Sequence, residues 1–363
     1  MQQHITSLQS FRGIAALIVL IHHCMFYFNY DSQIKSWTEF FFNAHAAVVA
    51  FYVLSGYVLT LSLMKKEISF PSITEFYIRR GFRIYPAFWV AAMISLLYLI
   101  IFRDTSKSVL VSEWWSVNHN DNYISWSKVF INFIGFGTEL PLPTWSISLE
   151  IIASILLPFL IIFLKKSEKL FIILTFFLGY ISLNSGGILN IYMFYFALGS
   201  SITLWGKYLN SMNKKILLVI GLISICFIFF GRQIGGWNYT NYYHSPYAAL
   251  IEGLSSSILI SIIATHPNIF NILKNKILVY LGDISYSIYL LHLPIMAFIA
   301  ILLEKMALLQ YITNNGLILS LLLLLLTTIL TIVFSDFLYK RVELNGIKYG
   351  KFIIRIINRK TPL

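Results

Sequence analysis

The sequence predicts an all-α integral membrane protein, a bundle of about ten transmembrane helices. Of its 363 residues, 58% are hydrophobic and only 12% are charged. A mean hydropathy of +0.75 is too high for a chain that folds around a single core surrounded by water. Several apolar runs also reach the length of roughly 18 residues that a helix needs to cross a bilayer about 30 Å thick.

Ten apolar segments are long enough, or nearly long enough, to cross the membrane as helices. They are 11–30, 44–64, 84–102, 144–164, 170–183, 188–206, 216–231, 246–265, 280–303 and 316–339. The fifth and the seventh of these segments are short. A further apolar stretch at 129–137 is interpreted either as a half-helix that dips into the membrane or as a segment that packs beneath the outer loop.

The net charge of +12 would favour a nucleic-acid partner in a soluble protein. Here the distribution of the basic residues explains the charge through topology. With the N-terminus in the cytoplasm, 21 Lys and Arg residues face inward and six face outward. This positive-inside pattern predicts an even number of spans with both termini cytoplasmic, and we expect no nucleic-acid partner.

A single membrane domain is predicted for residues 1–340, followed by a basic cytoplasmic tail at 341–363. The tail segment KYGKFIIRIINRK has the composition of an amphipathic helix on the inner leaflet. Cys24 and Cys226 both fall within predicted spans and outside any metal-ligand pattern. They predict neither a disulfide nor a metal site and are interpreted as small apolar packing residues.

The first span carries ionisable residues that an apolar helix does not need, in the stretch SFRGIAALIVLIHHCMFYF. Arg12 and His23 are eleven residues apart, which at about 100° per residue amounts to three turns plus about 20°. They therefore share one helical face and lie about 16 Å apart along the axis. His22 points about 80° away from Arg12 by the same count.

Ionisable side chains inside a membrane are costly and are by default functional, so this face is a candidate site. Arg12 would bind an anionic substrate at the cytoplasmic mouth, and His23 would act as an acid or base near the bilayer centre. Each residue also has a structural alternative. Arg12 would then be an anchor that snorkels to the inner surface, and His23 a hydrogen-bonded core group.

Together with other motifs, this pair resembles the integral-membrane acyltransferase-3 family, whose members acylate sugars and related hydroxyl compounds in the bacterial envelope and elsewhere. An arginine and a histidine with ten residues between them in the first span are that family's hallmark. The further segments that resemble family motifs, in the family's order, are FYVLSGYVL (51–59), RRGFRIYPAFW (79–89), TWSISLE (144–150), GDISYSIYLLHLP (282–294) and YKRVE (339–343). The resemblance covers almost the whole chain.

The chain departs from the family's pattern in places. Val49 stands where many members have an acidic residue before the second-span aromatic pair, so any role of that carboxylate is missing or supplied elsewhere. Asn345 stands where a proline is common. The chain also ends without the soluble catalytic domain that some members carry, so we expect no second, periplasmic acyl-transfer stage within it.

The resemblance implies that the donor substrate is an acyl-coenzyme A. Acetyl-CoA is expected, because acetyl is the group that members of the family usually transfer. No permanently bound cofactor is expected. Arg79, Arg80 and Arg83 are candidates, with Arg12, for binding its phosphates, because guanidinium groups match phosphate oxygens bidentately. Arg79 and Arg83 share a helical face if the third helix already extends there. Plain positive-inside anchoring is the alternative.

Glu150 is a candidate catalytic residue that would orient His23 or hold the acceptor's hydroxyls, unless it only links buried polar groups. Ser285, Tyr289 and His292 follow i, i+4, i+7 spacing and form a polar stripe on the ninth span. The predicted substrate-binding residues are Ser55, Trp145, Tyr286, Tyr289 and His292. The alternatives are helix–helix hydrogen bonding for the ninth-span residues and close packing beside Gly56 for Ser55.

The outer segment 103–143 contains EWWSVNHNDNYISW, which mixes Trp114, Trp115 and Trp126 with amide and carboxylate side chains. These groups suit a sugar acceptor, but an interfacial aromatic belt has a similar composition. The outer loop 232–245, with GGWNYTNYYHS, allows the same two interpretations.

We predict an enzyme of the bacterial plasma (inner) membrane, an O-acetyltransferase that moves an acetyl group from acetyl-CoA to an envelope saccharide. The acceptor would be O-antigen, capsule, or another polysaccharide or lipid-linked precursor. His23 would be the general base, or would carry the acyl group covalently. The alternative is a transporter or flippase of lipid-linked sugars, although the sequence lacks the internal repeats and paired broken spans typical of transporters.

Overall fold

The regular elements of the protein are helices. The computed structural model describes residues 2–65, 67–102, 110–118, 125–137, 140, 142–185, 188–234, 246–309 and 315–360. Within these ranges the structure contains no β-strand, and the one β-type pairing is an isolated bridge between Phe28 and Val111. The predicted all-α class is therefore confirmed.

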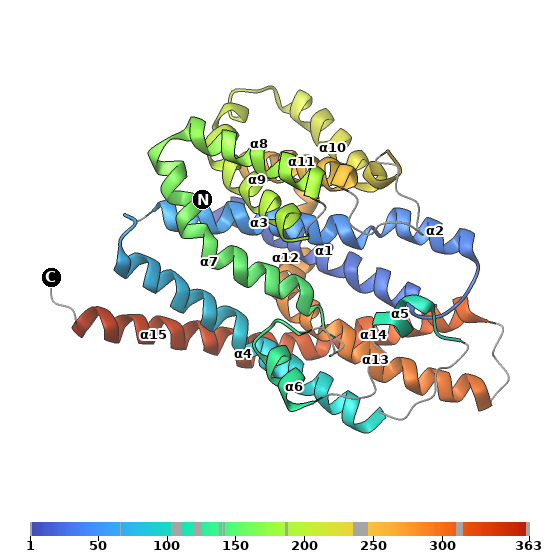
Figure 1. Cartoon of the computed structure of the whole chain (residues 1–363). Coiled ribbons are helices and arrows are strands. Elements are labelled where there is room, and N and C mark those ends of the chain that lie inside the picture. Colours follow the sequence, from blue (N-terminus) through green and yellow to red (C-terminus); the bar gives the residue numbers. More distant parts are fainter. Residues whose placement is uncertain are drawn as a thin grey trace. The chain divides into compact units, whose positions relative to one another are not determined.

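Each of the ten predicted spans coincides with a helix (Figure 1). These helices are α1 (Gln2–Tyr27), α3 (Ala44–Met64), α4 (Phe70–Phe102), α7 (Thr144–Lys166), α8 (Glu168–Ser185), α9 (Ile188–Leu209), α10 (Lys214–Ile234), α11 (Pro246–Thr265), α13 (Ser285–Leu309) and α14 (Gly316–Leu338). The shorter elements are α2 (Ser32–Phe41), α5 (Glu113–Asn118), α6 (Trp126–Phe133), the 3-10 turn η1 (Asn271–Lys274), α12 (Lys276–Asp283), the π-helical turn η2 (Tyr339–Glu343) and α15 (Leu344–Lys360).

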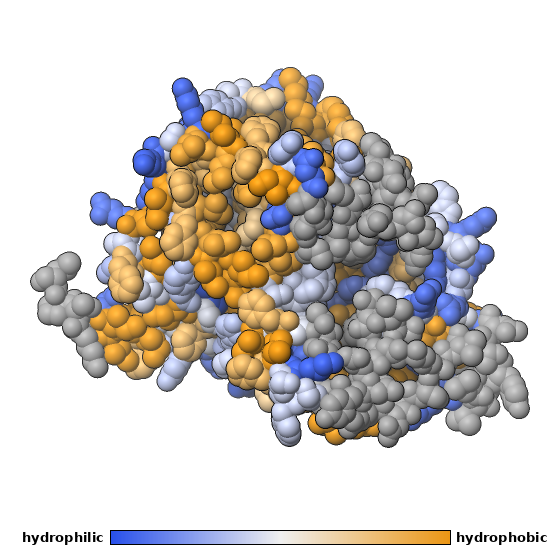
Figure 2. All heavy atoms as spheres, in the orientation of Figure 1, coloured by the Kyte–Doolittle hydropathy of each residue, from blue (hydrophilic) through white to orange (hydrophobic). Residues whose placement is uncertain are grey.

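Much of the protein surface is apolar. Large hydrophobic side chains are widely exposed, for example Phe176 at 72% and Ile100 at 65%, and Figure 2 shows hydrophobic residues over much of the visible face. Among the described residues, seven helical stretches are long and apolar enough to cross a membrane. Such a surface is stable in lipid and not in water, so this is a multi-pass membrane protein. The total of ten spans and their orientation remain predictions.

Several predicted boundaries are wrong by one or more turns. α1 begins at Gln2 and α4 at Phe70, well before the predicted starts at 11 and 84. The predicted ninth span is divided, because α12 ends at Asp283 and α13 begins at Ser285. Hydropathy marks the part of a helix that lipid surrounds, whereas backbone hydrogen bonding continues into polar residues. The stretch 129–137 is helical only in part, as the end of α6.

The described chain forms two compact units. The first comprises Met1–Ala15, Asn43–Tyr77 and Leu149–Asp283. Its central helix α3 packs against α9 and α11, and α9 also packs against α8. A β-carbon at Gly56 would lie 2.3 Å from the carbonyl oxygen of Phe196. Only glycine permits α3 and α9 to approach so closely, which supports the packing interpretation for Gly56.

The second unit comprises Ala16–Phe42, Ile78–Ser148 and Ile284–Leu363. α13 packs against α14, and α14 continues through η2 into α15, the predicted basic tail. A β-carbon at Gly346 in α15 would lie 2.6 Å from the carbonyl oxygen of Phe82 in α4. Figure 1 shows α15 beside α4. The tail is therefore a helix packed on α4, and its position at the inner leaflet remains a prediction.

Candidate active site

The centre of the candidate site is a pair of histidines in the second unit. Nδ1 of His23, on α1, lies 2.8 Å from Nε2 of His292, on α13. The two rings are nearly parallel, with centroids 5.1 Å apart. His292 is buried and His23 half-buried. The structure thus places two residues that were predicted separately, one as a base and one as a substrate ligand, in direct contact.

Backbone carbonyls determine which nitrogens of this pair carry protons. Nδ1 of His292 lies 2.8 Å from the carbonyl oxygen of Tyr289, and a carbonyl can only accept a hydrogen bond. We therefore assign the proton of neutral His292 to Nδ1, so its Nε2 is an acceptor. Nδ1 of His23 must then donate to it, which leaves the lone pair of His23 on Nε2. His23 is thereby held in the tautomer whose basic nitrogen is Nε2.

The short segment that leads into α5 is hydrogen-bonded to the end of α1 and contacts His23. The amide of Ser112 donates to the carbonyl of Tyr27 at 2.8 Å, and the Ser112 hydroxyl donates to the carbonyl of Phe26 at 2.6 Å. These bonds place the Trp114 ring nearly parallel to His23, with centroids 5.2 Å apart. Trp115 contacts Tyr27 with its ring tilted by 47° and the centroids 4.9 Å apart. Two aromatic residues of the predicted sugar segment thus contact the site helix.

The remaining aromatic and polar residues of that segment divide into two groups. Trp126 is 88% exposed and is not part of this contact. His119, Asn120 and Asp121 lie outside the described residues, as does most of the second outer loop, 235–245. The sugar interpretation therefore depends, within the described chain, on Trp114 and Trp115.

The polar stripe predicted on the ninth span contacts three different helices. His292 bonds to α1, as described above. The hydroxyl of Tyr289 lies 2.7 Å from that of Ser146, at the start of α7 and next to the half-buried Trp145. The Tyr286 hydroxyl donates to the carbonyl of Ile84 in α4 at 3.0 Å. Tyr289 and Trp145 thus lie near the start of α7, whereas Tyr286 is turned toward the α4 backbone.

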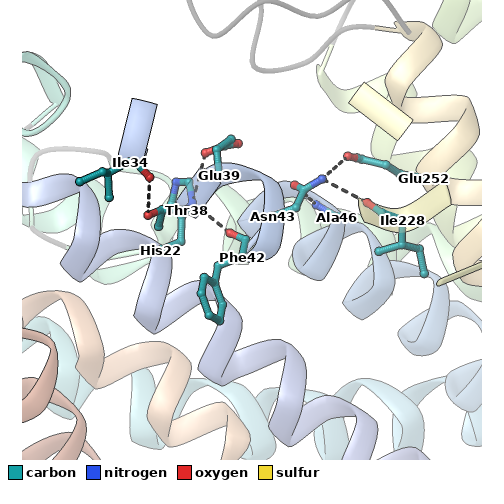
Figure 3. A network of polar contacts seen from close by, with 9 residues as sticks. All are labelled: His22, Ile34, Thr38, Glu39, Phe42, Asn43, Ala46, Ile228 and Glu252. Atoms are coloured by element: carbon teal, nitrogen blue, oxygen red, sulfur yellow. Dashed lines mark hydrogen bonds and ion pairs between the residues drawn. The ribbon is translucent and has the colours of Figure 1, made fainter. Parts of the chain in front are cut away.

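His22 is bonded differently from its neighbour His23. It is buried, and its Nδ1 lies 3.1 Å from the carbonyl oxygen of Phe42 and 3.3 Å from Oε2 of Glu39 (Figure 3). Both partners belong to or directly follow α2. His22 therefore links α1 to α2, a structural role that agrees with the helical count that chose His23.

The predicted cationic residues lie on α1 and α4. Arg12 lies on the first-unit part of α1, near Asp283 at the end of α12. The two side chains are close enough to interact electrostatically. Arg79, Arg80 and Arg83 all lie inside α4, so the predicted shared face of Arg79 and Arg83 exists. Arg79 is exposed and the other two are half-buried.

Besides Arg12, two predicted site residues belong to the first unit, Glu150 and Ser55. Glu150 is half-buried on α7, and its backbone carbonyl accepts the Ser154 hydroxyl at 2.7 Å. Ser55 is half-buried on α3, next to Gly56. Their roles in orienting His23 and in substrate binding remain predictions.

Sequence reasoning missed a buried polar cluster in the first unit. Nδ1 of His45 lies 2.5 Å from Oε2 of Glu252. Asn43 donates to Oε1 of Glu252 at 2.9 Å (Figure 3). Nε2 of His45 lies 3.4 Å from the Tyr192 hydroxyl. Glu252 and His45 are ionisable residues within predicted spans, the same signal that singled out His23 and that could have found them.

A search against known protein families identifies the chain. The model of the acyltransferase-3 family, described as an acyltransferase domain, matches residues 5–340. The chain belongs to this family. The resemblance predicted from the ordered motifs is thereby confirmed, and the family is one of acyltransferases, not of transporters.

Similar proteins occur in Listeria monocytogenes and Staphylococcus aureus. The peptidoglycan O-acetyltransferase OatA of Listeria monocytogenes is 29% identical over 343 residues, which cover 84% of this chain and 51% of the relative. The O-acetyltransferase OatA of Staphylococcus aureus strain NCTC 8325 is 26% identical over 341 residues, 82% of this chain and 51% of the relative. The chain thus spans about half the length of these relatives. No solved structure matches it.

Proposed function

We propose that the protein is a membrane O-acetyltransferase that moves an acetyl group from acetyl-CoA to a hydroxyl of an envelope saccharide. Membership of the acyltransferase family supports the reaction type, and the names of the relatives support the acetyl group. The observation that carries the proposal is the His23–His292 bond, because it gives the hallmark histidine a defined basic nitrogen.

The proposed topology has ten spans with both termini in the cytoplasm of a bacterium, in its inner membrane. A helix at each predicted span and the inward bias of Lys and Arg support it. Arg12 and the arginines of α4 are then on the side where coenzyme A is available. They would bind its phosphates, with the acyl end directed toward His23.

In the proposed reaction, Nε2 of His23 removes the proton of the acceptor hydroxyl as its oxygen attacks the thioester carbonyl. The C–O bond forms, the C–S bond breaks, and the proton passes from His23 to the departing thiolate of coenzyme A. While His23 carries this proton, Nε2 of His292 accepts the hydrogen bond from Nδ1 and keeps the ring in place. His292 is therefore a positioning residue, which replaces its predicted role as a substrate ligand.

The acceptor would approach from outside, where Trp114 and the Tyr289–Ser146 pair lie close to the histidines in the described structure. A covalent variant keeps the same residues. In it, Nε2 of His23 attacks the thioester, coenzyme A leaves, and the acceptor hydroxyl then takes the acetyl group from the ring nitrogen.

The direct test uses the full-length protein in nanodiscs with labelled acetyl-CoA and envelope glycan from a strain that lacks the protein. We expect label transfer to the glycan, and at least a hundredfold loss in His23→Ala, since a positioned base contributes about 10²–10⁴-fold. The melting temperature should stay unchanged in the variant. A transporter would neither transfer nor hydrolyse the donor, and normal transfer by His23→Ala would refute the assignment of the base.

A further inference from the structure

Glu304, near the outer end of α13 in the proposed topology, is a carboxylate that no motif singled out. It lies within the apolar stretch Ser285–Met306 and is half-buried. The Tyr27 hydroxyl donates to its Oε1 at 2.8 Å. Tyr27 is itself fully buried and lies one helical turn beyond His23 on α1. Glu304 is therefore hydrogen-bonded to α1, the helix that carries the proposed base, about one turn from His23.

The charge of Glu304 is not balanced by a cation within the described residues. The neighbouring Lys305 lies with its Nζ over the Phe102 ring, 5.5 Å from the ring centroid. The salt bridges among the described residues do not include Glu304. An unpaired carboxylate in an apolar span is costly, and such residues are retained where they bind a substrate.

Aromatic side chains lie near this carboxylate. Tyr27, which donates to it, contacts the Trp115 ring. Tyr98, which is close enough to Glu304 for an electrostatic interaction, packs against Phe298 with ring centroids 5.3 Å apart. Aromatic side chains beside a single acceptor-only carboxylate suit a neutral ligand rich in hydroxyl groups, because such a ligand supplies donors without a charge.

The distance between Glu304 and the His23–His292 pair determines which part of such a ligand Glu304 would contact. Glu304 is twelve residues after His292 on the same helix, which corresponds to about 18 Å along the axis. This separation exceeds the size of one sugar ring. A saccharide whose hydroxyl reaches His23 would therefore place a neighbouring sugar, and not the acylated one, beside Glu304.

We propose that Glu304 is a specificity-determining residue that binds hydroxyl groups of a second sugar unit in the acceptor. The inference rests on the proposed function, since it assumes a saccharide acceptor at His23. Tyr27 holds one carboxylate oxygen in place, and the other oxygen accepts the ligand's hydroxyls. The enzyme would then prefer oligosaccharide acceptors over single sugars.

The test compares KM for size-separated acceptors, using single-sugar and oligosaccharide fragments of envelope glycan from a strain that lacks the protein. In Glu304→Gln the amide oxygen can still accept from Tyr27, but the charge is lost. We expect KM for the oligosaccharides to rise about tenfold, as for loss of a hydrogen bond to a charged group. KM for single sugars and the hydrolysis of acetyl-CoA without acceptor should not change.

Glu168→Gln is the matched control, because it removes an exposed carboxylate of α8. It should leave both KM values unchanged. Glu304→Asp retains the charge and should give an intermediate KM, which keeps the test valid if Glu304→Gln does not fold. Equal effects on both acceptor sizes, or none, would overturn the inference. Absence of donor hydrolysis and transfer by the wild type would instead refute the proposed function.

Discussion

Each unit contains a histidine that contacts another ionisable side chain, and the two histidines differ in their partner and in their burial. In the first unit, His45 contacts the carboxylate of Glu252 and is 1% exposed, while Glu252 is fully buried. In the second, His23 contacts the neutral ring of His292 and is only half-buried. Both pairs combine residues more than 200 positions apart in the sequence.

Under the proposed function, this difference separates a structural pair from a reactive one. Both oxygens of Glu252 accept hydrogen bonds, and each ring nitrogen of His45 has a polar neighbour, so the cluster is closed. Such a satisfied buried network stabilises one arrangement of helices and has little reason to exchange protons. His23 has a neutral partner that accepts from Nδ1 and leaves Nε2 as its basic nitrogen. Burial of an ionisable residue in a membrane therefore does not by itself identify a catalytic group.

The largest effect on this comparison is expected from Glu252→Ala. The substitution leaves His45 and Asn43 buried without their carboxylate, so the free energy of unfolding should fall by about 3–5 kcal/mol. Thermal unfolding in detergent measures the loss. The activity of the remaining folded protein should match the wild type. A stable variant with reduced activity would assign the first-unit cluster to the reaction and break the comparison.

His292→Ala is expected to have an intermediate effect, mainly on activity. Without the acceptor at Nδ1, the His23 ring loses its fixed tautomer and orientation, so kcat should fall about tenfold to a hundredfold. KM for acetyl-CoA should remain unchanged, while loss of the buried ring and its polar contacts should lower the stability by about 1 kcal/mol. Steady-state kinetics distinguish this from a packing defect, which would lower the yield of folded protein. A rise in KM with normal kcat would return His292 to its predicted role as a substrate ligand.

The smallest effect is expected from His22→Ala. The side chain makes two polar contacts to the α2 region, and their loss should cost about 1 kcal/mol of stability. Activity should change by less than about twofold, because His22 is not part of the proposed reaction. Chemical denaturation and the transfer assay on the same preparation measure both quantities. A loss of activity as large as that in His23→Ala would mean that the helical count chose the wrong histidine.

Much of the fold could be predicted because hydropathy is a local property. Every predicted span coincides with a helix, since a long apolar run in lipid must satisfy its own backbone hydrogen bonds. The ends of α1 and α4 could not be predicted, because polar residues continue a helix without an apolar signal. The break between Asp283 and Ser285 was missed because the apolar runs 277–281 and 288–293 on either side favour one continuous span.

The candidate site was predictable only in part. The spacing of Arg12 and His23 along one helix follows from 3.6 residues per turn, and the motif order indicated the family. The partner of His23 did not follow from either. His292 had been assigned to a polar stripe, and Glu304, Glu252 and His45 had not been singled out at all.

The sequence by itself determined the helices, the membrane class, the family and the residue that we propose as base, because each depends on composition or on spacing within one segment. Only the tertiary structure decided that His292 contacts His23, that Trp114 stacks on His23 and that Tyr27 donates to Glu304. These contacts join residues up to 277 positions apart. Apolar helices carry almost no local signal for which neighbour they face, since lipid and protein are equally apolar surroundings.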